Sequence, residues 1–421
     1  MKYQSGKQFA AEMDSRDPLA VYRDQFYIPK TENGEDCIYL CGNSLGLQPK
    51  AVKNYVEQEL KDWENLAVDG HFHAKNPWAP YHEFLIKSTT QLTGAKPHEV
   101  VVMNTLTVNL HLMMVSFYCP TPERHKILIE YNAFPSDQYA VKSQLKYHGY
   151  DPKNSLIELQ PANNEEIVYT EDMASLIEKE GDSIALILIG GVNYYSGQLY
   201  DMREITRLGQ KKEIMVGFDL AHAIGNVPLK LHDWNVDFAA WCTYKYLNSG
   251  PGSIAGCFIH ERHARQFDIP RFEGWWGHDK KTRFLMGPEF QPIYGAEGWQ
   301  LSNPPILPLA SLRASMKIFD EAGMQKLRHK SILLTGYLEF LIDGLSSNEM
   351  TIITPRSLRD RGSQLSIKIH RNGKNLFEKL TSNGIICDWR EPDIIRVAPV
   401  PLYNSFTDVY RFIETLKKYI T

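Results

Sequence analysis

Several familiar signatures are missing from this chain of 421 residues. It has no C-x-x-C pair, no G-x-G-x-x-G and no Walker sequence, so ATP and dinucleotides lack their usual phosphate loops. Six cysteines are scattered, mostly within apolar runs, namely Cys37, Cys41, Cys119, Cys242, Cys257 and Cys387. We therefore expect buried, reduced thiols, no zinc site and a cytoplasmic protein.

Signals for membranes, secretion and nucleic acid are missing as well. No stretch approaches 18 consecutive apolar residues, which argues against a membrane-spanning helix. The first 24 residues are rich in charge and lack the apolar core of a secretory signal. The formal net charge is −4 and no basic stripe stands out, so we expect neither a membrane nor a nucleic-acid partner.

The composition that is present is typical of a globular α/β protein, with 43% apolar and 23% charged residues. Strand-like runs at 99–103, 127–130, 183–189, 214–218, 238–242 and 254–259 alternate with helical patterns. These helical patterns lie at 107–117, before 146 and at 202–211. The alternation predicts a mostly parallel sheet covered by helices.

The pattern changes after about residue 304, and the length also favours more than one core. A long helical region at 309–345, interrupted near 322–323, precedes short strands at 364–369 and 394–397. A helix at 375–382 and a last helix capped by Ser405 complete this part. We predict an N-terminal arm (1–45) that packs with a small α+β C-terminal domain (305–421), and a large domain (46–304).

Two charged residues end apolar strands, Asp219 after 216–218 and Lys245 shortly after 238–242. Ligands of parallel sheets bind at the carboxyl ends of strands. An amine and a carboxylate placed there can serve pyridoxal phosphate, the lysine by forming a Schiff base and the aspartate by keeping the ring nitrogen protonated. A solvated lysine and a helix-capping aspartate are the structural alternatives.

Other residues fit the same site, each with an alternative. Leu106 and Thr107 lie where a strand turns into a helix, which suits a phosphate or simple capping. Phe134 can stack on a flat ring or pack in the core. His222 can contact the cofactor or fill its turn. Arg396, inside an apolar strand, can bind a substrate carboxylate or form a buried ion pair.

Two aromatic segments, 70–73 and 274–278, look like walls of a pocket for a flat substrate. The His-x-His of the first segment can bind a metal in principle, but the sequence offers no clear third ligand. We therefore predict no metal.

Taken together, several long segments resemble the kynureninase family, pyridoxal-phosphate enzymes of the aspartate-aminotransferase fold (fold type I). The matching segments span nearly the whole chain, at 42–49, 106–111, 134–137, 217–222, 240–248, 302–305 and 396–405. One departure is Gly190, where animal members carry serine, which puts one hydrogen bond to the cofactor in question.

The resemblance implies roles for the matching residues. The catalytic residues would be Lys245, Tyr244 and Asp219. The cofactor shell would comprise Leu106, Thr107, Phe134, Pro135, Ser136, Asp137, Asp219, His222, Tyr244, Lys245, Trp275 and Asn303. The substrate would meet Ser44, His71, Asn303 and Arg396. The family also implies a homodimer with shared active sites, in which Trp275 and Asn303 come from the second subunit.

The implied reaction is hydrolytic cleavage of the Cβ–Cγ bond of kynurenine or 3-hydroxykynurenine, which gives an anthranilate-type acid and alanine. It would serve tryptophan breakdown or the supply of NAD precursors. Lys245 would remove the α-proton and Tyr244 would return a proton to Cβ. Asn303 beside His71 favours the hydroxylated substrate.

Three alternatives differ from this reading: a cysteine desulfurase, an aminotransferase, or a non-catalytic scaffold on the same fold. A desulfurase needs a reactive cysteine in a loop. The apolar approach to Cys387, at 384–386, predicts a strand instead.

Overall fold

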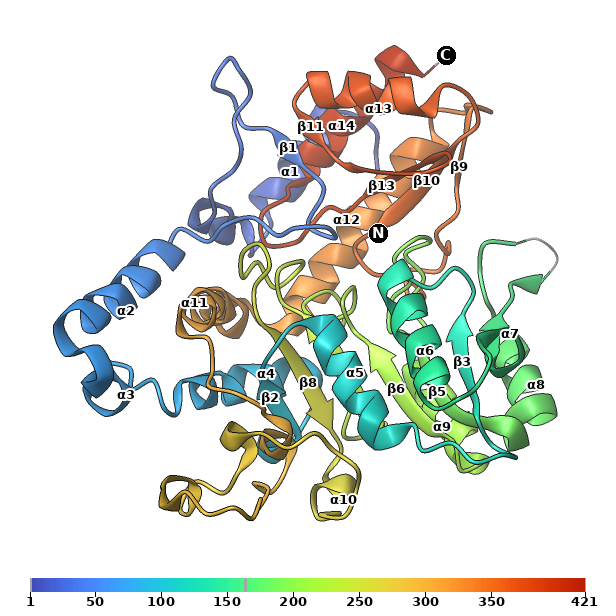
Figure 1. The fold of residues 1–421 in the computed structure, drawn as a ribbon. Helices are drawn as coiled ribbons and strands as arrows, with labels where there is room; N and C mark the ends of the chain where they lie inside the picture. The colour runs from blue at the N-terminus through green and yellow to red at the C-terminus, as the bar shows by residue number, and fades with distance from the viewer. Residues whose placement is uncertain (1, 163–164, 421) are drawn as a thin grey trace.

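The computed structural model describes residues 2–162 and 165–420. Its larger sheet has seven strands in the order β2-β8-β7-β6-β5-β3-β4 (Figure 1). The strands are β2 (Val100–Val102), β3 (Lys126–Glu130), β4 (Leu156–Leu159), β5 (Ile184–Gly190), β6 (Met215–Asp219), β7 (Phe238–Cys242) and β8 (Ala255–Ile259). The five strands β3 to β7 run parallel to one another, whereas β8 is antiparallel to both of its neighbours, β2 and β7. The predicted α/β fold with a mostly parallel sheet is confirmed.

Helices cover both faces of this sheet, because its central strands are apolar on both sides. One face packs against α5 (Leu106–Phe117) and α6 (Pro135–Tyr147). The other face packs against α4 (Ile86–Thr93), α8 (Thr170–Glu180), α9 (Met202–Lys211) and α11 (Ile306–Ala322). The remaining helices of this part are α2 (Val52–Leu66), α3 (Gly70–His73), α7 (Pro152–Ser155) and α10 (Glu261–Ala264).

The carboxyl ends of the parallel strands bring polar groups to one edge of the sheet. β3 ends at Glu130, β5 at Gly190 and β6 at Asp219. The register pairs Gly190 with Asp219, and Asp219 with Ala240 of β7. Residues far apart in the sequence therefore meet at this edge, where parallel sheets bind their ligands.

A second, four-stranded antiparallel sheet has the order β12-β13-β10-β9. Its strands are β9 (Met350–Ile352), β10 (Leu365–Ile369), β12 (Asp388–Arg390) and β13 (Ile394–Val397). Three helices pack with it, α12 (Met324–Asp343), α13 (Gly373–Ser382) and α14 (Phe406–Tyr419). We call residues 324–420 the C-terminal unit, which lies above the large sheet in Figure 1.

The predicted helical break and the predicted helix cap are both present. Gly323, between α11 and α12, has a φ of +77°, a conformation that glycine adopts without a steric cost. The Ser405 side chain accepts the backbone N–H of Asp408 at the start of α14. The first residues lie against this unit, since α1 (Lys7–Ser15) contacts α14 and β1 (Ile38–Tyr39) pairs with β11 (Ile385–Ile386).

The cysteine prediction needs a correction. All six cysteines are free, as predicted, and four are buried, but Cys119 is exposed and Cys41 is partly exposed. Cys119 lies two residues beyond the end of α5, where the chain has already left the core. Within the described ranges, no helix is long and apolar enough to cross a membrane.

Candidate active site

A cavity of about 170 Å³ opens at the carboxyl edge of the large sheet. Its walls come from the ends of β6 and β7 and the first turns of α5 and α6. The lining residues are Thr105, Leu106, Thr107, Phe134, Ser136, Asp137, Asp219, Ala221, His222, Tyr244 and Lys245. The structure thus gathers nine of the residues that the sequence analysis assigned to the cofactor, from four separate segments.

Lys245 projects into this cavity from the turn after β7. Its Nζ lies 2.9 Å from Nε2 of His222 and 5.7 Å from the centre of the Phe134 ring. Burial, reinforced by the neighbouring Lys245 cation, lowers the pKa of His222 well below its usual value. A neutral imidazole can accept a hydrogen bond from the lysine, so His222 holds the amine in place over the cavity.

Asp219 lies at the end of β6 with only 8% of its surface exposed. Its Oδ1 accepts the backbone N–H of Ala221 at 2.7 Å. Burial raises the pKa of Asp219, while the Lys245 cation and a hydrogen bond from Asp137 oppose that rise. Burial and the adjacent Asp219 raise the pKa of Asp137 well above its usual value. Asp137 therefore retains its proton and donates a hydrogen bond to Asp219, which carries the charge that faces the cavity.

The N-terminus of α5 provides an anion-binding wall. Thr105 is extended and its side chain caps no N–H group, so the first N–H groups of α5 have no side-chain acceptor, and residues 105–107 line the cavity. The hydroxyl groups of Thr107 and Ser136 lie 2.7 Å apart at the same wall. Backbone N–H groups and two hydroxyls at a positive helix end suit a phosphate group.

Arg396 lies beyond the cavity, on β13 of the C-terminal unit, and only 1% of its surface is exposed. Its Nη2 contacts Oδ2 of Asp388 at 2.6 Å and Oγ of Ser44 at 3.2 Å. Arg390 also pairs with Asp388, with Nε 3.0 Å from Oδ1. One carboxylate thus faces two guanidinium groups, which leaves a positive charge that an amino-acid carboxylate can neutralise.

Several predicted residues lie outside the cavity of this chain. Pro135 begins α6 but does not line the cavity. Asn303 is exposed, and His71 on α3 hydrogen-bonds the carbonyl of Val68. Among the described residues, no hydrogen bond joins Asn303 to His71. Trp275 lies in a separate, exposed aromatic cluster.

That aromatic cluster brings the two predicted pocket-wall segments together. Phe72 and Trp275 both pack edge-on against Phe284, with ring centres 6.2 and 5.5 Å apart. Phe72 is 59% exposed and Phe284 is 56% exposed. Contiguous exposed aromatic side chains mark a surface suited to a partner. We call Phe72, Trp275 and Phe284 the aromatic patch.

Sequence reasoning missed Glu130, a buried carboxyl group close to Asp219. Glu130 accepts the backbone N–H of Gly190 with both carboxylate oxygens, at 3.1 and 3.2 Å. Burial raises the pKa of Glu130 to about 7. A Cβ on Gly190 would lie 3.0 Å from Oε1 of Glu130, so a side chain at this position would crowd the carboxyl group. Glu130 ends β3 with a carboxyl group, as Asp219 ends β6, so the sequence pattern that singled out Asp219 also applies to Glu130.

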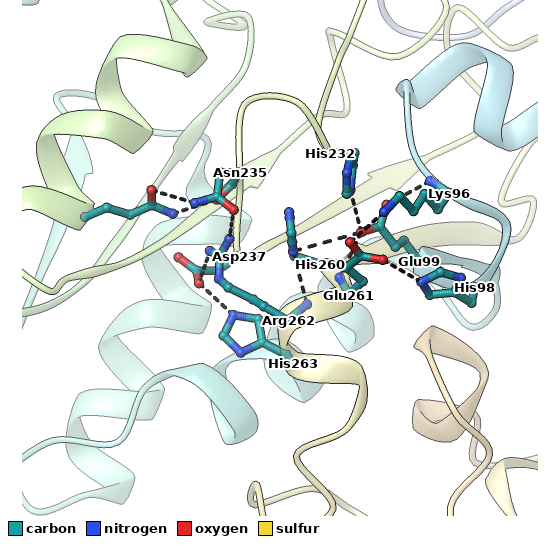
Figure 2. Close-up of polar contacts among 11 residues, drawn as sticks. Lys96, His98, Glu99, His232, Asn235, Asp237, His260, Glu261, Arg262 and His263 are labelled. Carbon is teal, nitrogen blue, oxygen red and sulfur yellow. Dashed lines mark hydrogen bonds and ion pairs between the residues drawn. The ribbon is translucent and has the colours of Figure 1, made fainter.

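A second polar cluster lies at the antiparallel edge of the large sheet, away from the cavity (Figure 2). Glu99 is fully buried and accepts the backbone N–H groups of Lys96 and Glu261 at 2.8 Å. His232 Nδ1 lies 2.9 Å from the same carboxylate, and the His232 and His260 rings stack with centres 4.9 Å apart. Because protein donors already use both oxygens of Glu99, we interpret this cluster as a structural clasp.

Comparisons with known proteins agree with this geometry. Residues 327–416 match the family model described as the kynureninase C-terminal domain. The curated kynureninase of Koribacter versatilis (strain Ellin345) is 61% identical, over 98% of this chain and 97% of its own. That of Myxococcus xanthus (strain DK1622) is 56% identical, over 99% and 97%. The kynureninase of the animal Nematostella vectensis is 50% identical, over 97% and 93%.

Solved structures with the same fold are far more distant in sequence. The apo cysteine desulfurase of Thermococcus onnurineus NA1 superposes with a TM-score of 0.76 at 16% identity, covering 99% of each chain. The K223A mutant of C-DES, which has glycine covalently linked to its PLP cofactor, gives 0.77 at 16% identity, covering 94% of this chain and 98% of that one. At such low identity the superposition establishes the fold alone, which is fold type I.

The desulfurase alternative also disagrees with the local structure. Cys387 follows β11 directly and is 6% exposed, as the strand prediction anticipated. Burial raises the pKa of its thiol, so the thiolate is disfavoured. A buried thiol without thiolate character is a poor sulfur acceptor.

Proposed function

The chain belongs to the kynureninase family, and from that premise we propose that it uses pyridoxal phosphate to hydrolyse the Cβ–Cγ bond of kynurenine. The products are an anthranilate-type acid and alanine. The observation that carries this proposal is the convergence of Lys245, Asp219 and Phe134 on one cavity beside the N-terminus of α5. The family membership favours this reaction over desulfuration and transamination on the same fold.

The cavity fits the parts of pyridoxal phosphate one by one. The phosphate suits the N–H groups of Leu106 and Thr107, with the hydroxyls of Thr107 and Ser136. Asp219 suits the protonated ring nitrogen, and the exposed face of Phe134 suits the flat ring. Among the described residues, the buried Nδ1 of His222 has no hydrogen-bond partner. Such a polar atom is expected to find one on a ligand.

When bound, the cofactor supplies an electron sink for negative charge at the substrate α-carbon. Arg396 binds the substrate carboxylate and thereby orients the α-carbon toward Lys245. In its uncharged form, the Lys245 amine would take the α-proton, and the neutral His222 ring keeps that amine directed at the reacting carbon. Asp219 supplies the negative charge that stabilises a proton on the ring nitrogen.

Tyr244 is the proposed proton donor to Cβ. Tyr244 lines the cavity beside Lys245, and the Lys245 Nζ lies 6.0 Å from the centre of the Tyr244 ring. Burial raises the pKa of Tyr244, so the phenol holds its proton until a stronger base forms. Water adds to the γ-carbonyl carbon, the Cβ–Cγ bond breaks to release the anthranilate-type acid, and a hydroxyl that stays protonated at neutral pH can then deliver a proton to Cβ.

We propose that the active unit is a homodimer with shared sites, located in the cytoplasm. The aromatic patch supports this, since it carries Trp275 on an exposed surface, outside the cavity of its own chain. A partner chain would bring Trp275 and Asn303 to the opposite site and would bury the patch. Six free cysteines suit a reducing compartment.

We also propose a division of the chain into an arm (1–45), a large domain and a small domain. Because α11 (Ile306–Ala322) packs in the core of the large sheet, we place the boundary between the two domains near Gly323 instead of at residue 304. Two separate apolar cores support the division, one at each sheet, and the arm contacts the C-terminal unit through α1 and β1. His71 and Asn303 would meet the aromatic end of the substrate and favour its 3-hydroxy form.

The test is to load the purified protein with pyridoxal phosphate and offer kynurenine, 3-hydroxykynurenine and cysteine separately. We expect anthranilate or its 3-hydroxy form, with one alanine for each, and a higher kcat/KM for 3-hydroxykynurenine. Lys245→Ala is the control and is expected to be inactive with both. Sulfide release from cysteine without any aromatic acid would overturn the proposal in favour of a desulfurase.

A further inference from the structure

A tight turn at Asn193–Gln198 follows β5 and presents Tyr194 above the cavity edge. The Oδ1 of Asn193 accepts the N–H groups of Tyr195 and Ser196, both at 2.9 Å. Gly197 has a φ of +78° and donates its N–H to the carbonyl of Asn193 at 3.0 Å. These local bonds give the turn one defined shape, which fixes the direction of the Tyr194 side chain.

The C-terminal unit is attached to this turn through three successive carbonyl groups. Arg396 Nη1 donates to the Tyr194 carbonyl at 2.7 Å, and Gln364 Nε2 donates to it at 3.0 Å. The hydroxyl of Ser366 donates to the next carbonyl, that of Tyr195, and Thr354 donates to the carbonyl of Ser196. The turn therefore determines where the C-terminal unit, with Arg396, sits relative to the large sheet.

The Tyr194 ring lies between the two groups that would hold the ends of the reacting amino acid. It packs edge-on against Phe134, with ring centres 5.2 Å apart and planes at 81°. The Arg396 guanidinium carbon lies 6.0 Å from the centre of the same Tyr194 ring. Phe134 in turn lies beneath Lys245. Lys245, Phe134, Tyr194 and Arg396 thus form a continuous row of contacts across the site.

We propose that Tyr194 is a positioning residue, which fixes the distance and orientation of the carboxylate-binding Arg396 relative to the Phe134 face where the amino group reacts. This inference rests on the proposed function, since it assumes an α-amino acid substrate held at both ends. The ring itself carries this role, because no hydrogen bond to its hydroxyl is found among the described residues. A phenylalanine at this position preserves the edge contact, and a small or aliphatic side chain removes it.

The experiment compares Tyr194→Ala, Tyr194→Phe and Tyr195→Ala in the cofactor-loaded protein. Tyr195 is the matched control, because it is an aromatic residue of the same turn and is also half-buried. Tyr194→Ala is expected to raise KM for kynurenine about fivefold to tenfold, the loss expected from an aromatic contact, with kcat changed less. Tyr194→Phe and Tyr195→Ala are expected to keep KM within about twofold of the wild type.

A binding measurement separates positioning from turnover. The dissociation constant of L-alanine, the amino-acid product, is measured by calorimetric titration. In Tyr194→Ala it should rise by the same factor as KM. Tyr194→Leu serves the same comparison if the alanine variant does not fold. An unchanged KM in Tyr194→Ala, or an equal loss in Tyr194→Phe, would overturn the inference. If the wild type did not hydrolyse kynurenine, the proposed function would fail. If the wild type hydrolysed kynurenine and KM did not depend on Tyr194, only the positioning role would fail, so the two failures are distinguishable.

Discussion

At the scale of single residues, the distribution of protons decides what the cavity can do. Asp137, with its raised pKa, donates a hydrogen bond, and Asp219 accepts it and keeps a charge beside the Lys245 cation. His222, with its lowered pKa, stays neutral next to that cation. The result is one amine, one carboxylate and one uncharged imidazole around an aromatic face. This set favours a protonated heteroaromatic ring with a reactive aldehyde.

Arg396 gives the first residue-scale prediction. Arg396→Ala is expected to raise KM for kynurenine by roughly 10- to 100-fold, because a buried charge-assisted contact with the substrate carboxylate is lost. Steady-state kinetics measure this. Arg390→Ala, which removes the more exposed partner of Asp388, is expected to raise KM only a fewfold. Equal effects of the two substitutions would contradict the assignment of Arg396 as the carboxylate-binding residue.

Glu130 gives a pH-dependent prediction. Its pKa is raised from 4.5 to about 7 in the folded protein, so the folded state binds a proton that the unfolded chain releases. Its contribution to stability is therefore present below about pH 4.5 and is lost as the pH rises to 7, by about 3 kcal/mol in total. Glu130→Gln should remove this loss.

The measurement is chemical unfolding of cofactor-loaded wild type and Glu130→Gln at pH 5 and pH 8. The free energy of unfolding of the variant minus that of the wild type should be larger (more stabilising) at pH 8 than at pH 5. Glu64→Gln, which changes an exposed carboxyl on α2, is the control and should give the same difference at both pH values. A pH-independent effect of Glu130→Gln would show that this carboxyl is charged throughout.

The sequence allowed part of the site to be predicted, for a physical reason. Asp219 and Lys245 follow apolar strands, and parallel strands end at a common edge, so their proximity can be inferred without coordinates. The roles of Asp388 and Tyr194 depend on contacts between β13, the turn after β5 and the segment around Ser44. The contacts of Arg396 with Tyr194 and with Ser44 join residues 202 and 352 positions apart, and no local pattern encodes them. Asp388 lies only 8 positions from Arg396, but it meets the guanidinium through the pairing of β12 with β13.

At the scale of elements, hydrophobic patterns located most strands and helices but not their directions. The runs at 238–242 and 254–259 became β7 and β8, within one residue at each end. That β8 runs antiparallel to β7 was not predictable, because both strands are buried on both faces and read alike. β4, at one edge, is only partly buried and mixes polar with apolar residues, so its pattern gave no clear signal.

The Glu99 clasp carries the element-scale prediction. Glu99 directly precedes β2 and accepts the N–H of Glu261 at the start of α10, so it joins the two elements (Figure 2). Glu99→Ala removes this acceptor for two backbone N–H groups and for His232. It is expected to lower the free energy of unfolding by about 2–4 kcal/mol, because buried donors are left without partners. Urea denaturation measures this. Glu261→Ala, which removes a partly exposed carboxylate of the same cluster, should cost less than about 1 kcal/mol.

At the scale of the whole molecule, the proposed homodimer explains why two expected site residues lie elsewhere in the chain. Trp275 belongs to the exposed aromatic patch and Asn303 is exposed. A two-fold axis that buries the patch would carry both residues to the other chain's cavity, and each cavity would then be completed by its partner.

Co-expression of two inactive variants tests this shared site. Lys245→Ala and Trp275→Ala damage different halves of each proposed site, so a mixed dimer contains one site with both changes and one intact site. Random pairing should restore about a quarter of wild-type turnover, as the symmetry of a dimer with two shared sites requires. Turnover no higher than the mean of the separately purified variants would place Lys245 and Trp275 in sites of the same chain.

The most direct test of the whole account is to find where the aldehyde attaches. The protein is loaded with pyridoxal phosphate, reduced with borohydride to fix any lysine–aldehyde link, and digested for peptide mass spectrometry. We predict a single stoichiometric modification on Lys245, which is prevented by Lys245→Ala. A modification on another lysine, or none on a protein that still hydrolyses kynurenine, would contradict it.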